Sequence, residues 1–112
     1  MEVNLDKLDE NRVEKALIYL SDTDKDHADL GGEVKRLEEG IKQAQAHQFL
    51  LAEGTVAERE AKAKASAKYN EAVLEHIQAF KDFKLIDNQR NHEIRIIDIW
   101  RTLSSNRRQG TI

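Results

Sequence analysis

The sequence contains no cysteine and no proline, and only five of its 112 residues are glycine. Without cysteine the chain can form neither a disulfide framework nor a thiolate zinc site, which suits a reducing compartment. Without proline, nothing in the sequence forbids long, uninterrupted helices. Aromatic residues make up only 5% of a chain that is long enough for one domain. These shortages predict a single helical domain over residues 1–112.

The N-terminal segment lacks the pattern of a signal peptide, which begins with basic residues followed by an apolar core. Its first twenty residues carry five acids, namely Glu2, Asp6, Asp9, Glu10 and Glu14. No apolar run in the chain approaches the length that a bilayer requires. We therefore expect a soluble protein of the cytoplasm.

Charge is distributed unevenly along the chain. Residues 1–60 hold 8 Lys and Arg against 15 Asp and Glu, a net charge of −7, whereas residues 61–112 hold 10 against 6, a net charge of +4. No acid follows Asp98, but three arginines do. A chain with an acidic N-terminal half and a basic C-terminal half can pair with copies of itself or bind an anionic partner.

Apolar periodicity predicts a short helix followed by a long one. The pair Asn11 and Glu14 resembles a helix cap and opens a short helix over about residues 11–20. The stretch "SDTD" at residues 21–24 then interrupts it with residues that favour caps and turns. A second helix over residues 24–53 carries a heptad pattern that forms a packing seam. The hydrophobic residues of this seam are Leu30, Val34, Leu37, Ile41 and Leu51.

Gly54 and the capping box "TVAE" that follows it mark a tight turn into the last helix. We expect an antiparallel hairpin, with the last helix over residues 55–103 and a frayed basic tail over residues 104–112. The last helix continues the seam with Tyr69, Val73, Ile77 (or the neighbouring His76), Phe80, Ile94 and Ile97. The polar stretch Asp87–Asn91 leaves open whether this helix bends.

In this prediction, the second half of the last helix extends beyond the end of the helix that packs against it. It carries Ile94, Ile96, Ile97, Ile99 and Trp100, which would form an exposed apolar patch on a monomer. A thin hairpin also buries little apolar surface by itself. We therefore predict an all-α, coiled-coil-like hairpin with a short N-terminal helix that assembles into a homo-oligomer.

The stretch "SDTDKDHADLGGE" has part of the spacing of an EF-hand calcium loop. Four acids fall at the first, third, fifth and twelfth loop positions: Asp22, Asp24, Asp26 and Glu33. The sixth position, which should be glycine, is His27. We therefore interpret this stretch as the acidic start of a helix, where carboxylates complement the helix dipole.

No catalytic motif is present. The sequence has no nucleophile elbow and no Gly-rich phosphate loop, and its four histidines share no helix turn. Asp and Glu on long helices mostly serve as solvated charges. We expect no enzyme activity, no metal site, no cofactor, no small-molecule substrate and no membrane contact.

Basic residues of the last helix form the remaining candidate site. Arginine and lysine can neutralise phosphates, and an aromatic ring can stack on an unpaired base. The candidate nucleic-acid-binding residues are Lys62, Lys64, Lys68, Trp100, Arg101, Arg107 and Arg108. The alternative interpretation is that the lysines form the polar face of a charged helix and that Trp100 lies in an oligomer core.

Three stretches, "VEKALIYLSDTD…ADL…EVKRLE", "EGTVAER" and "DIWRTLSSNRRQG", together resemble a group of small helical coiled-coil proteins from tailed bacteriophages. Proteins of this group tend to be encoded among recombination and replication genes. The resemblance covers Val13 to Gly110, although the pair Gly31 and Gly32 departs from the pattern of the group. It implies an accessory protein that acts near single-stranded DNA in the cytoplasm of a host cell.

Two functions follow as hypotheses, with a structural virion component as a third. In the first, an oligomeric scaffold contacts single-stranded DNA, or a DNA-bound recombination or replication protein, through its basic tail. In the second, the acidic N-terminal half is an interaction module that inhibits or adapts a host or defence protein. The first requires Arg107, Arg108 and nearby lysines on one face, whereas the second requires an exposed acidic helix.

Overall fold

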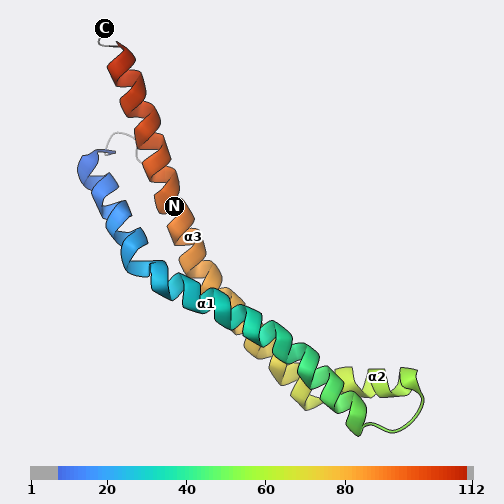
Figure 1. Cartoon of the computed structure of the whole chain (residues 1–112). Helices are drawn as coiled ribbons and strands as arrows, with labels where there is room; N and C mark the ends of the chain where they lie inside the picture. The colour runs from blue at the N-terminus through green and yellow to red at the C-terminus, as the bar shows by residue number, and fades with distance from the viewer. Residues whose placement is uncertain (1–7, 111–112) are drawn as a thin grey trace. The chain divides into compact units, whose positions relative to one another are not determined.

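The computed structural model describes residues 8–110, which form three α-helices joined by two short connections (Figure 1). The helices are α1 (Glu10–Leu51), α2 (Val56–Ala65) and α3 (Ala67–Gly110). No strand occurs in this part of the chain. The prediction of an all-α helical hairpin is confirmed.

Two compact units make up the chain. The terminal unit combines residues 8–27 with residues 85–110, and the turn unit spans residues 28–84, including all of α2. In each unit a stretch of α1 packs antiparallel to a stretch of α3 (Figure 1). Each unit therefore has its own packing between the two long helices.

α1 runs without interruption through the break predicted at residues 21–24. Thr23 lies within the helix, and its hydroxyl donates a hydrogen bond to the Tyr19 carbonyl, one turn earlier, at 2.7 Å. The same hydroxyl accepts a hydrogen bond from Arg90 of α3 at 2.8 Å. Contacts with α3 thus outweigh the weak helix preference of this stretch, and the prediction of two separate helices is wrong.

The first helix begins at Glu10, close to the predicted start at about residue 11, but its cap differs from the predicted one. The Asp9 carboxylate accepts a hydrogen bond from the backbone N–H of Arg12 at 2.9 Å, which satisfies one of the free amides at the start of α1. Glu10 lies in the first turn. The predicted capping pair of Asn11 and Glu14 therefore lies inside the helix. The acids of "SDTDKDHADLGGE" are likewise mid-helix residues and not the start of a helix.

The turn between α1 and α2 has the predicted glycine and N-cap, but among the described residues the Glu58 side chain accepts no hydrogen bond from the Thr55 backbone N–H, so only half of the predicted capping box is present. Gly54 adopts a φ of 121°, a conformation that residues with a side chain rarely adopt. Thr55 is the N-cap of α2, and its hydroxyl accepts a hydrogen bond from the Glu58 backbone N–H at 3.2 Å. A Cβ at position 54 would collide with the Glu58 side chain. The positive φ is therefore the reason that this position requires glycine, since the exposed Glu58 side chain could move away from a Cβ.

Ser66 separates α2 from α3, where the sequence predicted one helix over residues 55–103. Its backbone is extended, with φ of −70° and ψ of 150°. The Ser66 hydroxyl donates to the Ala63 carbonyl at 2.6 Å and accepts a hydrogen bond from the Tyr69 backbone N–H at 3.2 Å. One serine thus ends the first of these helices and caps the second.

α3 remains helical through Asp87–Asn91 and continues to Gly110. The predicted tail over residues 104–112 is therefore helical up to that glycine, and residues 111–112 lie outside the described residues. Arg107 and Arg108 occupy the last turn. Their charges favour this extension because cations stabilise the negative end of a helix dipole.

The second half of α3 packs against the first half of α1 in the terminal unit. Ile97 is buried with Val13 and Ala16 of α1, and Leu20 and Trp100 pack against this cluster. The prediction of a bare apolar arm is therefore wrong, because α1 extends far enough to cover it. The exception is Ile94, a predicted seam residue whose exposure is 43%.

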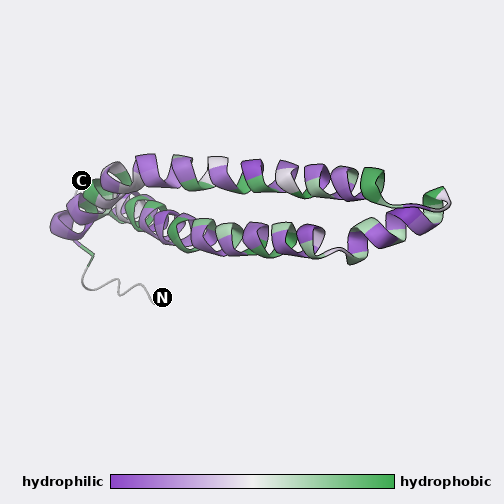
Figure 2. Cartoon of the chain, turned by 90° about the horizontal axis from the view of Figure 1, so that it is seen from below, coloured by the Kyte–Doolittle hydropathy of each residue, from purple (hydrophilic) through white to green (hydrophobic). Residues whose placement is uncertain are grey.

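The predicted seam is partly displaced in the turn unit. On α1, its residues are half-buried apart from Leu51, which is exposed. On α3, Tyr69 and Val73 are half-buried, and so is His76, the predicted alternative to Ile77. Ile77 itself and Phe80 are exposed. Hydrophobic and hydrophilic residues alternate along both long helices, so the apolar pattern alone did not define the packed face (Figure 2).

The packed face of α3 in the turn unit is set by small residues and by one ring. Ala79 is buried at 8% exposure, next to the exposed Phe80. The ring of Phe83 lies over Gly31 of α1, where an added Cβ would come within 3.4 Å of a ring carbon. Gly31 thus accommodates an aromatic side chain close to the backbone of α1.

Candidate functional site

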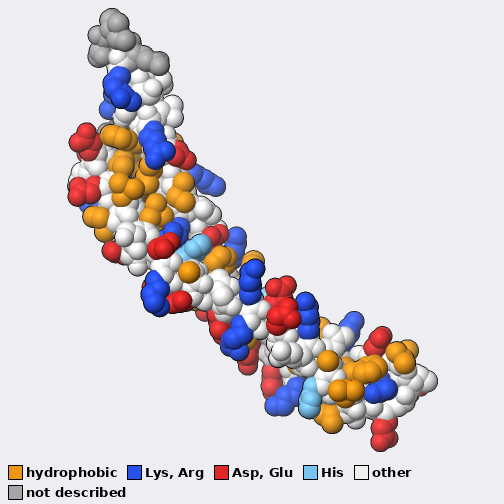
Figure 3. Space-filling view, viewed as in Figure 1, with side chains coloured by type: hydrophobic (Ala, Val, Ile, Leu, Met, Phe, Trp, Pro, Cys, Tyr) orange, Lys and Arg blue, Asp and Glu red, His pale blue; other side chains and the backbone are white. Residues whose placement is uncertain are grey.

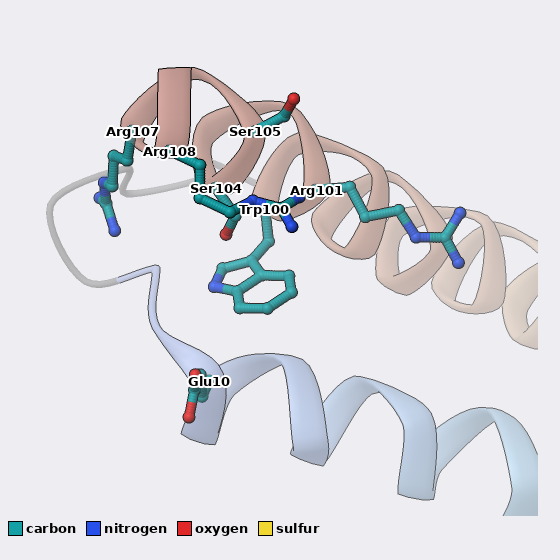
Figure 4. Close-up of a pocket in the computed structure, with 7 residues that line it drawn as sticks. All are labelled: Glu10, Trp100, Arg101, Ser104, Ser105, Arg107 and Arg108. Atoms are coloured by element: carbon teal, nitrogen blue, oxygen red, sulfur yellow. The ribbon is translucent and has the colours of Figure 1, made fainter. Parts of the chain in front are cut away.

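The terminal unit contains a cavity of about 670 Å³ between the last turns of α3 and the first turn of α1. Its lining residues are Glu10, Trp100, Arg101, Ser104, Ser105, Arg107 and Arg108 (Figure 4). Cavities of this size are common at ligand-binding sites. The structure thus brings together the four members of the predicted nucleic-acid-binding set that lie at the end of the chain.

The core of the terminal unit holds Trp100 in place. Its ring packs against the cluster of Val13, Ala16 and Ile97, and it is half-buried. Figure 4 shows the indole projecting from α3 toward the first turn of α1. The ring therefore has a fixed base in its own chain and also lines the cavity, so that a ligand in the cavity would contact it.

The arginines of the site differ in their surroundings. Arg101 is exposed and lies 3.9 Å from the Asp98 carboxylate of the preceding turn, which makes a weak ion pair. Arg107 is exposed and forms no hydrogen bond or ion pair with the described residues. Figure 4 shows Arg101 and Arg107 pointing in different directions. Arg107 is therefore the guanidinium best placed to receive an anion in the cavity.

Three lining residues were not predicted from the sequence. Ser104 and Ser105 are half-buried hydroxyl donors, and Glu10 contributes a carboxylate from α1 (Figure 4). The serines follow Trp100 at helical spacing, which could have identified them. Glu10 could not be identified, because only the hairpin brings the start of α1 beside the end of α3.

The predicted lysines lie in the turn unit and do not line this cavity. Lys62 donates a hydrogen bond to the Glu53 carbonyl at 2.7 Å and so serves the turn after α1. Lys64 and Lys68 are exposed. The neighbouring Arg59 stacks over the Phe49 ring, 4.1 Å from its centroid, and donates to the Phe49 carbonyl at 3.2 Å. These contacts hold α2 against the end of α1.

A set of polar contacts crosses between α1 and α3 below the cavity. Arg12 forms an ion pair with both carboxylate oxygens of Glu93, at 2.9 and 2.8 Å. Arg90 donates hydrogen bonds to the Leu20 carbonyl at 2.7 Å and to the Thr23 hydroxyl at 2.8 Å. These side chains occupy positions that a hydrophobic seam would fill with apolar residues, so they fix which residues of the two helices face each other.

The Glu93 carboxylate is buried, and its environment acts on its pKa in both directions. Burial raises the pKa, whereas the hydrogen bond and charge of Arg12, together with a hydrogen bond from Gln89, lower it. The favourable contacts outweigh burial, and the pKa lies below the usual value for a glutamate. Glu93 is therefore a charged group at neutral pH and holds Arg12 in place.

One histidine also takes part in these cross-helix contacts. His27 Nε2 lies 2.9 Å from the Asp87 carboxylate, within the terminal unit. Among residues 8–110, no group of three or more His, Cys, Asp or Glu side chains is arranged to hold a metal ion. The contact between His27 and Asp87 thus joins α1 to α3 within the terminal unit.

Comparisons with protein-family models, curated proteins and solved structures found no match. No helix in the described part of the chain is both long and apolar enough to cross a membrane. The geometry and charge of the cavity at the end of α3 are therefore the basis for assigning a function.

Proposed function

We propose that this protein is a non-catalytic accessory protein of DNA recombination or replication, and that it contacts single-stranded DNA through the cavity at the end of α3. The observation that carries the proposal is the meeting of Trp100, Arg107 and Arg108 at one cavity. The resemblance to small helical phage proteins points to the same process.

The chemistry of the lining suits a nucleotide with an unpaired base. A guanidinium can donate two parallel hydrogen bonds to a phosphate, and hydroxyls such as those of Ser104 and Ser105 can donate further ones. An indole can stack on any base, at a gain of about 1–3 kcal/mol per base. Single-stranded DNA offers unpaired bases and phosphates together, whereas the bases of a duplex are already stacked.

Two features of the site disfavour the binding of an anion. Glu10 places a carboxylate on the α1 side of the cavity, and the last carbonyls of α3 carry partial negative charge. Binding must therefore depend on the arginines, and it must weaken as salt screens their charges. We expect modest affinity and a marked dependence on ionic strength.

Fluorescence anisotropy of a labelled single-stranded oligonucleotide, titrated with protein at several salt concentrations, tests the proposal. The variant Arg107→Ala/Arg108→Ala should bind more weakly, and the slope of log affinity against log salt should fall by roughly 1.4, or about 0.7 per lost phosphate contact. The matched control is Lys64→Ala/Lys68→Ala, which removes two positive charges from exposed positions outside the cavity.

Equal losses in the two variants would show that net charge, and not this cavity, drives binding. Absence of binding by the wild-type protein at low salt would contradict the proposal for the isolated protein. The exposed acids of α1 would then be the surface to test, by pull-down, for a protein partner. Circular dichroism should accompany each variant, because Arg107 and Arg108 also complement the helix dipole.

A further inference from the structure

The turn unit buries very little apolar surface. Among its residues, the only hydrophobic side chains that are buried are Ala63 and Ala79. Its larger hydrophobic side chains are half-buried or exposed, and hydrophobic side chains are visible on the surface of both units (Figure 3). Two alanines provide little stabilisation, because burial contributes in proportion to apolar area. This unit therefore has apolar surface that a partner would cover.

The most regularly spaced part of this surface lies on α3, and we call it the apolar stripe. It consists of Leu74, Ile77 and Phe80, which are 66%, 43% and 47% exposed. Their spacing of three residues places them on one side of the helix. A hollow of about 410 Å³ lies along the stripe and is lined by His76, Ile77, Phe80 and Lys81. The stripe thus offers both a projecting leucine and a hollow.

We propose that a second copy of this chain covers the apolar stripe, with the two α3 helices antiparallel and a two-fold axis close to His76. Glu71 and Lys81 lie five positions before and five positions after His76. In this arrangement Glu71 of each copy lies level with Lys81 of the other, and the two long side chains can approach each other along the edge of the stripe. Leu74, two positions before His76, then lies between the levels of Ile77 and Phe80 of the other copy, which line the hollow.

The charges favour this arrangement over the alternatives. A parallel pairing would bring Lys81, which lines the hollow, beside Lys81 of the other copy, and like charges at such positions repel. The antiparallel pairing makes two opposite-charge pairs and fills two hollows with the same residues. A two-fold interface uses one surface patch twice and closes on itself. The stripe suits such an interface because its middle residue, Ile77, and the hollow lie within a few residues of the axis.

Sedimentation velocity of the full chain over about 5–500 µM tests the proposal, since this range covers the dissociation constants expected of a small interface. We expect a monomer–dimer equilibrium. Ile77→Asp should abolish the dimer by placing a charge in the stripe, whereas Leu50→Asp should leave it intact. Leu50 is the matched control because it is 73% exposed and lies in the same unit, outside the stripe.

A charge exchange tests the orientation. Glu71→Lys and Lys81→Glu should each weaken the dimer about tenfold, because each change turns two attractive pairs into two repulsive ones. The double variant Glu71→Lys/Lys81→Glu should restore the wild-type affinity. The control Glu38→Lys makes the same change of charge on the exposed face of α1 and should have little effect.

A protein that stays monomeric over the whole range would overturn the proposal, as would a dimer that Ile77→Asp does not weaken. Failure of the double variant to recover would overturn the antiparallel arrangement. Circular dichroism of each variant shows whether the fold is retained, which is expected because the substituted positions are exposed. DNA binding and self-association are measured separately, so either can fail without the other.

Discussion

Arg12 and Glu93, 81 residues apart in the sequence, form a two-pronged ion pair between α1 and α3. The Glu93 side chain is 7% exposed and that of Arg12 is 32% exposed. Such a pair contributes more to specificity than to stability, because removing charges from water is costly. In this protein it fixes the alignment of the two helices directly below the cavity.

Substitutions at this pair should show the cost of leaving one charge alone. Arg12→Ala should destabilise the protein by about 2 kcal/mol, because the buried Glu93 carboxylate would lose its partner. Replacing both residues, as in Arg12→Met/Glu93→Leu, should stay within about 1 kcal/mol of the wild type. Urea unfolding of the single and double variants measures both values. A double variant as unstable as Arg12→Ala would contradict the proposed cause.

Acid should remove the contribution of this pair. The pKa of Glu93 is lower in the folded protein than its usual value, so its contribution is fully present above the usual glutamate pKa and is lost as the pH falls through the folded value. The difference in unfolding free energy between the wild type and Glu93→Gln should therefore shrink between about pH 5 and pH 3. A difference that stays constant over this interval would contradict the assignment.

The unbroken path of α1 can be tested with two neighbouring glycines. Gly32→Ala should stabilise the protein by about 1 kcal/mol, because alanine has the higher helix propensity and a Cβ there meets no atom within 4 Å. Gly31→Ala should gain less, because its Cβ would touch the Phe83 ring at 3.4 Å. Thermal unfolding followed by circular dichroism measures both. A loss of stability in Gly32→Ala would show that this region is not helical.

The sequence was informative where structure depends on neighbouring residues. Gly54 and Thr55 predicted the turn correctly, because a positive φ and a helix cap need particular residue types at adjacent positions. Ser66 was missed although its chemistry is equally local, because its neighbours have strong helix propensity.

Contacts between distant residues were not predictable in the same way. The 3–4 spacing of α1 continues from Leu20 through Thr23 and His27 to Leu30, but two of these residues are polar and a search for apolar residues passes over them. Their partners, Arg90 and Asp87, lie 67 and 60 residues away. The predicted break in α1 therefore arose from residues whose stabilising partners only the fold reveals.

Glu10 offers a gain-of-function test of the cavity. Glu10→Gln removes the carboxylate from the lining without removing an arginine, so single-stranded DNA should bind more tightly, by about three- to fivefold at low salt. Glu14→Gln is the control, because it is exposed on the next turn of α1 and does not line the cavity. Fluorescence anisotropy of a labelled oligonucleotide gives both affinities. Equal effects of the two substitutions would show that the cavity is not the binding site.

Binding of single-stranded DNA at the cavity can be tested directly through Trp100, which is the only tryptophan in the chain and lines the cavity. Its intrinsic fluorescence should be quenched as unlabelled single-stranded DNA is titrated in at low salt, because a base stacks on the indole. The quenching should reverse on addition of salt and should be lost in Arg107→Ala/Arg108→Ala. Binding that anisotropy detects while the Trp100 emission stays unchanged would place the DNA elsewhere and contradict the account.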